Sequence, residues 1–139
     1  MVYLICGSPC SGKSTYIKEH MQRGDLICDV DLIYGAISGQ DPHDAELYTH
    51  EIACMMHAGL KDIIRDRVGG WKDAYVVSLA NTEEKVQRDK ERVKADEVII
   101  IDTPFDVCIE RSKDRPPYFV FLIQEWFETK ELTGGNDGN

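Results

Sequence analysis

A glycine-rich segment close to the N-terminus carries the strongest chemical signal in the sequence. It reads Gly7-Ser8-Pro9-Cys10-Ser11-Gly12-Lys13-Ser14, with Thr15 next, and it fits the phosphate-binding pattern Gly-x-x-x-x-Gly-Lys-Ser/Thr. The glycines let the backbone curl so that successive amides face phosphate oxygens, and the N-terminus of the following helix adds partial positive charge. Lys13 offers a cation to the β- and γ-phosphates, and the Ser14 hydroxyl can ligate Mg²⁺. The segment therefore predicts a site for ATP or a similar nucleoside triphosphate with Mg²⁺.

Acidic side chains follow two of the short apolar runs. Asp29 and Asp31 come after the run at 26–28, and Asp102 comes after the run at 97–101. Ligands of parallel sheets bind beyond the carboxyl ends of the strands, so these positions favour a role at the site. We expect Asp31 to accept a proton from an attacking hydroxyl, with a helix N-cap as the alternative. Asp29 could hold Mg²⁺ through water or be structural, and a loop-capping role competes strongly for Asp102.

Two arginines and one cysteine complete the candidate site. Arg111 and Arg115 are four residues apart, so we expect them one helical turn apart on one face. Arginine can fork onto phosphate oxygens and stack on adenine, which predicts a cationic lid over ATP; the alternative is a solvated helix face. Cys10 is interpreted as a small residue that fits the loop, with a reactive thiol as the alternative.

Apolar runs and helical stretches alternate along the chain. The runs at 2–6, 26–28, 74–78 and 97–101 predict strands, and the continuous apolar character of the first indicates burial on both faces. Helices are predicted at 13–23, 31–37, 44–68, 104–115 and 118–130, with one more that Asn81 caps. Leu47, Ala53, Met56, Leu60, Ile63 and Ile64 are the expected apolar face of the longest helix. The alternation predicts a parallel sheet covered by helices on both faces.

Composition limits the class of protein. The 139 residues are 42% hydrophobic, which predicts a single domain over 1–132 and a flexible Gly- and Asn-rich tail at 133–139. The net charge of −9 disfavours extended duplex nucleic acid as a partner. Five cysteines without a Cys-x-x-Cys pair favour the reducing cytoplasm. The apolar runs are too short to span a bilayer, so no membrane partner is expected.

The order of these motifs resembles a known family. The segments are Ile5-Cys6-Gly7-Ser8-Pro9-Cys10-Ser11-Gly12-Lys13-Ser14-Thr15, then 27–33, then 99–115. Over about residues 2–117 the chain resembles the polynucleotide 5′-kinase-like group, which includes many phage-encoded and "AAA-domain" proteins. The resemblance implies a three-layer P-loop NTPase fold with a four- or five-stranded parallel sheet in the order 2-3-1-4. It also implies Mg-ATP in the P-loop, Asp31 as the general base for an acceptor hydroxyl, and Arg111 and Arg115 as the clamp on ATP.

Two departures from that group concern the acceptor. Tyr34 stands where a polynucleotide kinase typically has an arginine that holds the acceptor phosphate, and Leu79-Ala80-Asn81 replaces Asp-Thr-Asn. Both changes, and the acidic charge, argue against a nucleic-acid 5′-end as acceptor.

The favoured hypothesis is a phosphotransferase that uses Mg²⁺ and ATP and acts on a hydroxyl acceptor such as a nucleoside, a nucleotide or a nucleic-acid end. An ATPase and a non-catalytic ATP-binding accessory protein are the alternatives. No apolar strand ends in the Asp-Glu pair of P-loop motors, because Ser78 is followed by Leu79 and Asp102 by Thr103. Adenine is the default base, since no Asn-Lys-x-Asp motif for guanine is present.

Overall fold

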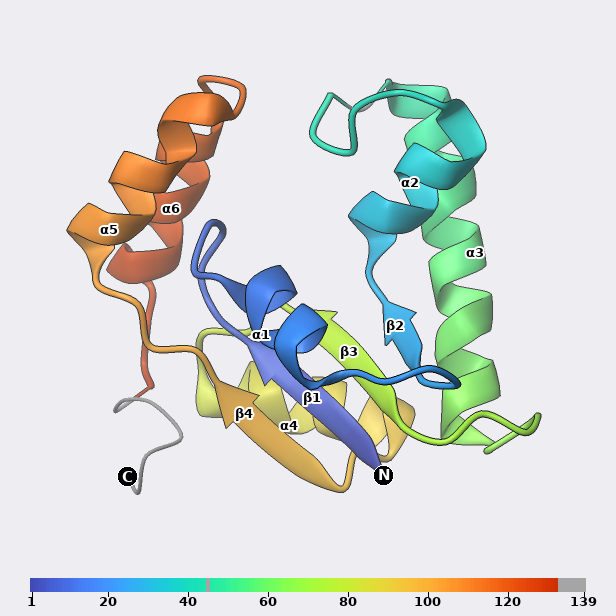
Figure 1. Ribbon diagram of the computed structural model, residues 1–139. Coiled ribbons are helices and arrows are strands. Elements are labelled where there is room, and N and C mark those ends of the chain that lie inside the picture. Colours follow the sequence, from blue (N-terminus) through green and yellow to red (C-terminus); the bar gives the residue numbers. More distant parts are fainter. Residues whose placement is uncertain (45, 133–139) are drawn as a thin grey trace.

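Four parallel strands form one sheet in the computed structural model, which describes residues 1–44 and 46–132. They are β1 (Val2–Cys6), β2 (Leu26–Cys28), β3 (Ala74–Ser78) and β4 (Glu97–Ile100). Their order in the sheet is β2-β3-β1-β4 (Figure 1), which confirms the expected topology. The predicted tail at 133–139 lies outside the described residues.

The strand register brings the ends of three strands to one level. β1 pairs with β3 from Val2 opposite Ala74 to Cys6 opposite Ser78, and Cys6 also lies opposite Ile100 of β4. The segments that follow β1, β3 and β4 therefore leave the sheet at one edge. In a parallel sheet this edge is where ligands bind.

Helices connect the strands and cover the sheet. They are α1 (Lys13–His20), α2 (Val30–Ser38), α3 (Leu47–Arg65), α4 (Glu83–Val93), α5 (Phe105–Arg111), a 3-10 turn η1 (Ser112–Asp114) and α6 (Phe119–Glu128). In Figure 1 the α2–α3 pair and the α5–α6 pair rise on opposite sides of the loop that joins β1 to α1. The elements that could close over a ligand thus flank the glycine-rich segment.

Alternate residues of β1 enter two separate cores. Val2, Leu4 and Cys6 are fully buried in one cluster with Ile64 of α3 and Val93 of α4. On the opposite face Ile5 packs in a second cluster, whose other buried members are Ile17 of α1, Tyr75 and Ile99. Burial on both faces explains why the strand is continuously apolar. The three-layer arrangement with helices on both faces is confirmed.

Several predicted helix boundaries need correction. α1 ends at His20 rather than residue 23, because Met21 is already extended and Gly24 adopts a φ of 97° in the following turn. α2 begins at Val30, and its N-cap is Asp29 rather than Asp31. α3 spans 47–65 instead of 44–68, since the Glu46 carboxylate accepts hydrogen bonds from the first-turn amides.

Two further predictions, the cap of α4 and the apolar face of α3, also need correction. Asn81 does not cap α4; Thr82 does, and Asn81 donates from its amide to the Trp126 carbonyl and the Thr129 hydroxyl of the last helical segment. On α3, Ala53 and Ile64 are buried as expected. Leu60 is partly buried, whereas Leu47, Met56 and Ile63, which were expected on the same apolar face, are exposed.

Candidate active site

The loop between β1 and α1 presents a row of free backbone amides. No described residue accepts a hydrogen bond from the amides of Gly12, Lys13, Ser14 or Thr15. The N-cap, Gly12, offers no side chain to satisfy them. Partnerless amides at the first turn of a helix carry partial positive charge and bind anions. The loop therefore has the donors that a phosphate chain requires.

Close packing explains both glycines of the loop. Gly12 has a φ of 100°, in the left-handed region, and a Cβ there would lie 3.2 Å from Arg111 Nη1. A Cβ on Gly7 would lie 2.6 Å from Ser11 Oγ and 3.1 Å from the carbonyl oxygen of Ile101. The segment after β4 also holds the loop directly, because Thr103 Oγ1 donates to the Ser11 carbonyl at 2.6 Å.

Lys13 lies inside the loop, with only 8% of its surface exposed. Its Nζ donates to the carbonyl oxygens of Gly7 at 2.8 Å and Ser8 at 2.7 Å. Burial lowers the pKa of Lys13 to about 8, and the nearby Asp29 carboxylate opposes that shift. A buried ammonium with two neutral carbonyl partners is a cation prepared for an anionic partner.

Cys10 occupies the loop as a small residue with a positive φ of 63°. Burial raises the pKa of its thiol, although Arg115, Lys13 and Arg111 act in the opposite direction. A raised pKa keeps the thiol protonated, so the alternative of a reactive thiolate has no support here.

Two carboxylates stand at the end of β2 and the start of α2. Asp29 is buried, and its Oδ1 accepts a hydrogen bond from the Asp31 amide at 3.0 Å. Burial raises the pKa of Asp31 first, and the Asp29 carboxylate raises it further; His43, His50 and Arg115 lower it. Asp29 neighbours Lys13, and Asp31 neighbours the arginine segment. The structure thus places both carboxylates at the binding edge.

The arginine segment is not one continuous helix. α5 ends at Arg111, a 3-10 turn follows, and Arg115 is extended with φ −114° and ψ 164°. The prediction that both arginines share one helical face is therefore wrong. Arg111 Nη1 donates to the Cys10 carbonyl at 3.3 Å, whereas Arg115 Nη1 donates to His43 Nε2 at 3.0 Å. Both side chains nevertheless border the loop.

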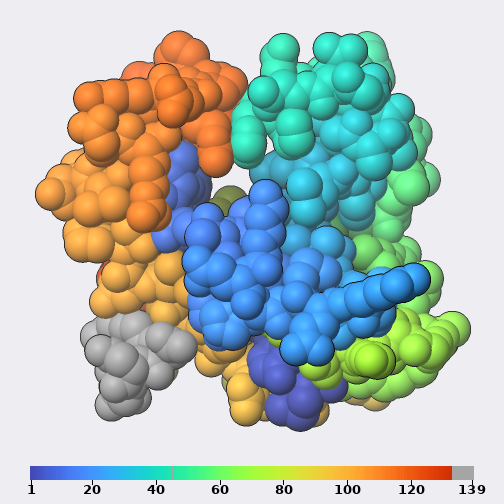
Figure 2. Space-filling model, viewed as in Figure 1, coloured from blue at the N-terminus to red at the C-terminus, as the bar shows by residue number. Residues whose placement is uncertain are grey.

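The contact between Arg115 and His43 bridges the two helical pairs. Tyr118 Oη also donates to the His43 carbonyl at 3.1 Å, and Phe119 packs edge-on against the His43 ring with centroids 5.5 Å apart. In Figure 2 the segments around these residues meet above a hollow, and the N-terminal segment of the chain lies below it. Sequence reasoning missed His43, Tyr118 and Phe119, because nothing in the sequence indicates that residues about 72 positions apart meet.

The remaining predicted residues differ in their burial. Ser14 and Thr15 are exposed at the start of α1. Asp102 is exposed and pairs with Lys130 at 3.4 Å, which favours the structural role for it. The side chains of Ser8, Pro9 and Ser11 are buried within the loop and shape it.

The fold and the glycine-rich loop define a protein of the P-loop class, and the comparisons agree. The sequence profile of the AAA domain family matches residues 2–119, so the chain belongs to this family. No curated protein matches the chain.

Two solved structures share the fold. One is described as "Structure of the Pnkp1/Rnl/Hen1 RNA repair complex", with a TM-score of 0.62 and 14% identity over 96% of this chain and 46% of that chain. The other is shikimate kinase from Acinetobacter baumannii in complex with shikimate, with a TM-score of 0.56 and 13% identity over 92% and 74% of the chains. The chain spans less than half the length of the first. Among the described residues, no helix has the length and apolar character needed to cross a membrane.

Proposed function

We propose that the protein transfers the γ-phosphate of ATP to a hydroxyl group of an acceptor, with Mg²⁺ as the cofactor. The observation that carries this proposal is the row of free amides beside the buried ammonium of Lys13, at the edge where Asp31 also lies. The amides and the ammonium fit a triphosphate, and the carboxylate supplies a base next to it.

Binding is the first task of these residues. The loop amides and Lys13 would hold the β- and γ-phosphates, and Arg111 would reach them from above the loop. The Ser14 hydroxyl and Asp29 would hold Mg²⁺, Asp29 through water. The metal, when bound, neutralises charge on the transferred group.

Transfer requires a proton acceptor for the attacking hydroxyl. Its oxygen forms a bond to the γ-phosphorus as the bond to the β,γ-bridging oxygen breaks, ADP leaves, and the proton passes to the Asp31 carboxylate. The raised pKa of Asp31 makes this carboxylate a stronger base than an exposed aspartate. The Arg115 guanidinium lies over the Phe119 ring, with its Cζ 5.5 Å from the ring centroid. It would stabilise the charge on the phosphoryl oxygens.

The position of Tyr34 bears on the acceptor. Its ring is 1% exposed, and its hydroxyl donates to the Asp44 carbonyl and accepts from the Glu46 amide. Tyr34 is thus a core residue that anchors the segment after α2. Because no cation stands at this position, the proposal favours an acceptor other than a nucleic-acid 5′-end.

An acceptor screen with ATP labelled at the γ-phosphate tests the proposal. Label on a nucleoside, nucleotide, sugar or oligonucleotide supports transfer, and label released only as inorganic phosphate supports the ATPase alternative. Equal affinity for ATP and ADP without turnover supports an accessory protein.

Three variants assign the roles. Lys13→Ala should abolish transfer, and Asp31→Asn should keep ATP affinity while it lowers turnover by at least about 100-fold, the usual contribution of a general base. Asp102→Asn is the matched control, because this carboxylate is exposed and paired with Lys130. Wild-type turnover in Asp31→Asn would remove Asp31 as the base.

A further inference from the structure

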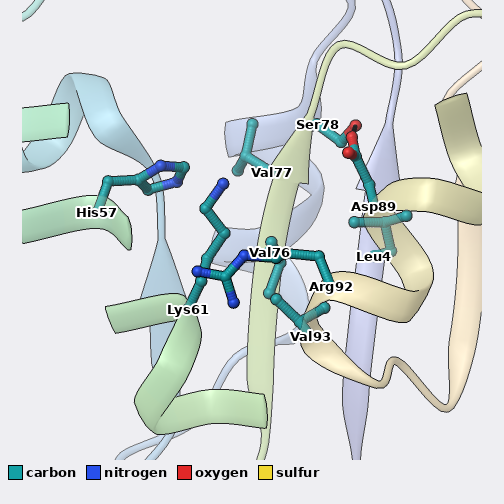
Figure 3. A pocket seen from close by; sticks show the side chains of 9 residues that line it. All are labelled: Leu4, His57, Lys61, Val76, Val77, Ser78, Asp89, Arg92 and Val93. Carbon is teal, nitrogen blue, oxygen red and sulfur yellow. Dashed lines mark hydrogen bonds between the residues drawn. The ribbon is translucent and has the colours of Figure 1, made fainter. Parts of the chain in front are cut away.

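A second cluster of basic groups lies between α3 and α4. His57 and Lys61 come from α3 and Arg92 comes from α4, and Val76, Val77 and Ser78 of β3 form the floor. Figure 3 shows the His57 ring, the Lys61 ammonium and the Arg92 guanidinium directed into the space between these elements. The cavity has a volume of about 30 Å³, counted as the space that the centre of a water molecule can occupy.

Two nitrogen atoms in this cavity lack partners. His57 Nε2 and Arg92 Nη1 are buried, and neither makes a hydrogen bond with any described residue. The other terminal nitrogen of Arg92 is satisfied, because Nη2 contacts Asp62 Oδ1 at 2.8 Å and donates to the Ala58 carbonyl at 3.2 Å. A buried polar nitrogen without a hydrogen-bond partner is costly, so a bound partner would stabilise both atoms.

No free carboxylate of the cavity supplies that partner. Asp89 lines the cavity, but its Oδ2 accepts from Ser78 Oγ at 2.7 Å and its Oδ1 accepts from Arg88 Nε at 3.1 Å. Lys61 and Arg92 thus both face the cavity, and the Asp89 carboxylate and the Asp62 partner of Arg92 relieve part of their mutual repulsion. A single water could bridge two nitrogens, but unlike an anion it would bring no negative charge to the two cations.

We propose that this cavity binds a small oxyanion with the chemistry of phosphate, through His57, Lys61 and Arg92. The anion accepts from Arg92 Nη1, from the Lys61 ammonium and from His57 as an Nε2–H donor. Charge-assisted hydrogen bonds of this kind are the strong ones. Burial and then the Lys61 and Arg92 charges lower the pKa of His57 to about 4, and a bound anion would raise it again.

The basic groups of this cavity are not those of the proposed γ-phosphate site, although Ser78 of its floor accepts a hydrogen bond from the Gly7 amide. His50 is the residue of α3 that faces Asp31, with its ring 6.3 Å from that of Tyr34. His57 and Lys61 follow it by 7 and 11 positions, which at 1.5 Å per residue is roughly 10 to 16 Å along α3. Free phosphate and a phosphate group of a larger molecule present the same oxyanion, so either could bind in this cavity.

Residue-resolved NMR with inorganic phosphate tests the proposal. We expect the ring signals of His57, assigned through His57→Gln, to shift saturably with phosphate and not with sodium chloride at equal ionic strength. The amide signals of Gly12 and Lys13 report phosphate at the P-loop separately. Unmoved His57 ring signals would overturn the cavity site, whether or not the P-loop amides respond.

Matched variants show whether the cluster is responsible. Lys61→Met should weaken the effect of phosphate on His57 at least about tenfold, because one charge-assisted hydrogen bond is lost. Lys61→Arg should retain most of it, and Lys18→Met on the exposed face of α1 should leave it unchanged. Unaltered affinity in folded Lys61→Met would refute the assignment. Glycerol phosphate as a second probe distinguishes the sources: a shift shows that the cavity admits an ester phosphate, and no shift shows a site for the free anion.

Discussion

Raising the pH from 7 to 9 should weaken nucleotide binding through Lys13. Burial lowers the pKa of this side chain to about 8 in the nucleotide-free protein, and a bound triphosphate would restore a value well above 9. Binding above pH 8 therefore takes up a proton. The charged fraction of Lys13 falls about tenfold between pH 7 and pH 9, so the affinity for ATP should fall about tenfold.

Isothermal titration of Mg-ATP and Mg-ADP across this range measures the effect. The last phosphate proton is lost near about pH 6, so the ligand charge stays constant. Lys13→Gln should bind ATP weakly, with an affinity that does not change with pH. Lys18→Gln should keep the pH dependence of the wild type. Equal wild-type affinity at pH 7 and pH 9, or the same slope in Lys13→Gln, would refute the reasoning.

The same shift has a consequence for stability without nucleotide. A depressed lysine pKa means that the unfolded chain binds the proton more tightly, so the free energy of unfolding should rise with pH between about 8 and the ordinary value of 10.5. Below pH 8 the buried charge costs about 3 kcal/mol, which the hydrogen bonds to Gly7 and Ser8 offset in part. Lys13→Met should flatten this pH dependence in urea unfolding. A free energy of unfolding that falls from pH 8 to pH 10 in the wild type, but not in Lys13→Met, would contradict the predicted direction.

Three other predictions concern single side chains. Gly12→Ala should lower the free energy of unfolding by about 1 to 3 kcal/mol because of its positive φ, whereas Gly59→Ala, with open space on α3, should raise it by up to about 1 kcal/mol in the same urea titration. Arg111→Ala should weaken ATP binding by about tenfold in calorimetry without a change in melting temperature, since its one bond in the free protein is long and exposed. Asn81→Ala should cost about 2 kcal/mol on urea unfolding, because two hydrogen bonds to the C-terminal segment are lost, and the exposed Gln124→Ala is its control.

The sheet and the P-loop could be predicted from sequence because their signals are local. A buried parallel strand is apolar throughout, as 2–6 and 74–78 are, and the glycine pattern fixes the loop between a strand and a helix. Helix boundaries were less accurate where two residues compete for one cap. Asp29 and Asp31 are both suited to the N-cap, and Asn81 and Thr82 likewise; tertiary contacts of Asn81 with the last helical segment decide the second case.

The candidate site depended on contacts that have no local signal. Arg111 and Arg115 are spaced for one helical face, yet the helix ends between them, because Arg115 is drawn toward His43 and Phe119 and precedes Pro116. The two arginines consequently serve different elements: one contacts the P-loop, and the other contacts the segment after α2.

This division has a mechanistic consequence for the proposed reaction. Arg111 can approach phosphates without disturbing the helical pairs, since its partner is a carbonyl of the loop itself. Arg115 can approach them only by giving up its hydrogen bond to His43, which joins the two sides of the hollow. The Tyr118 hydroxyl and the Phe119 ring also contact His43, so separation of the α5–α6 pair from the segment after α2 would break these contacts as well. In the proposed reaction the triphosphate would therefore compete with His43 for the Arg115 guanidinium, and its binding would be coupled to loss of the Arg115–His43 hydrogen bond.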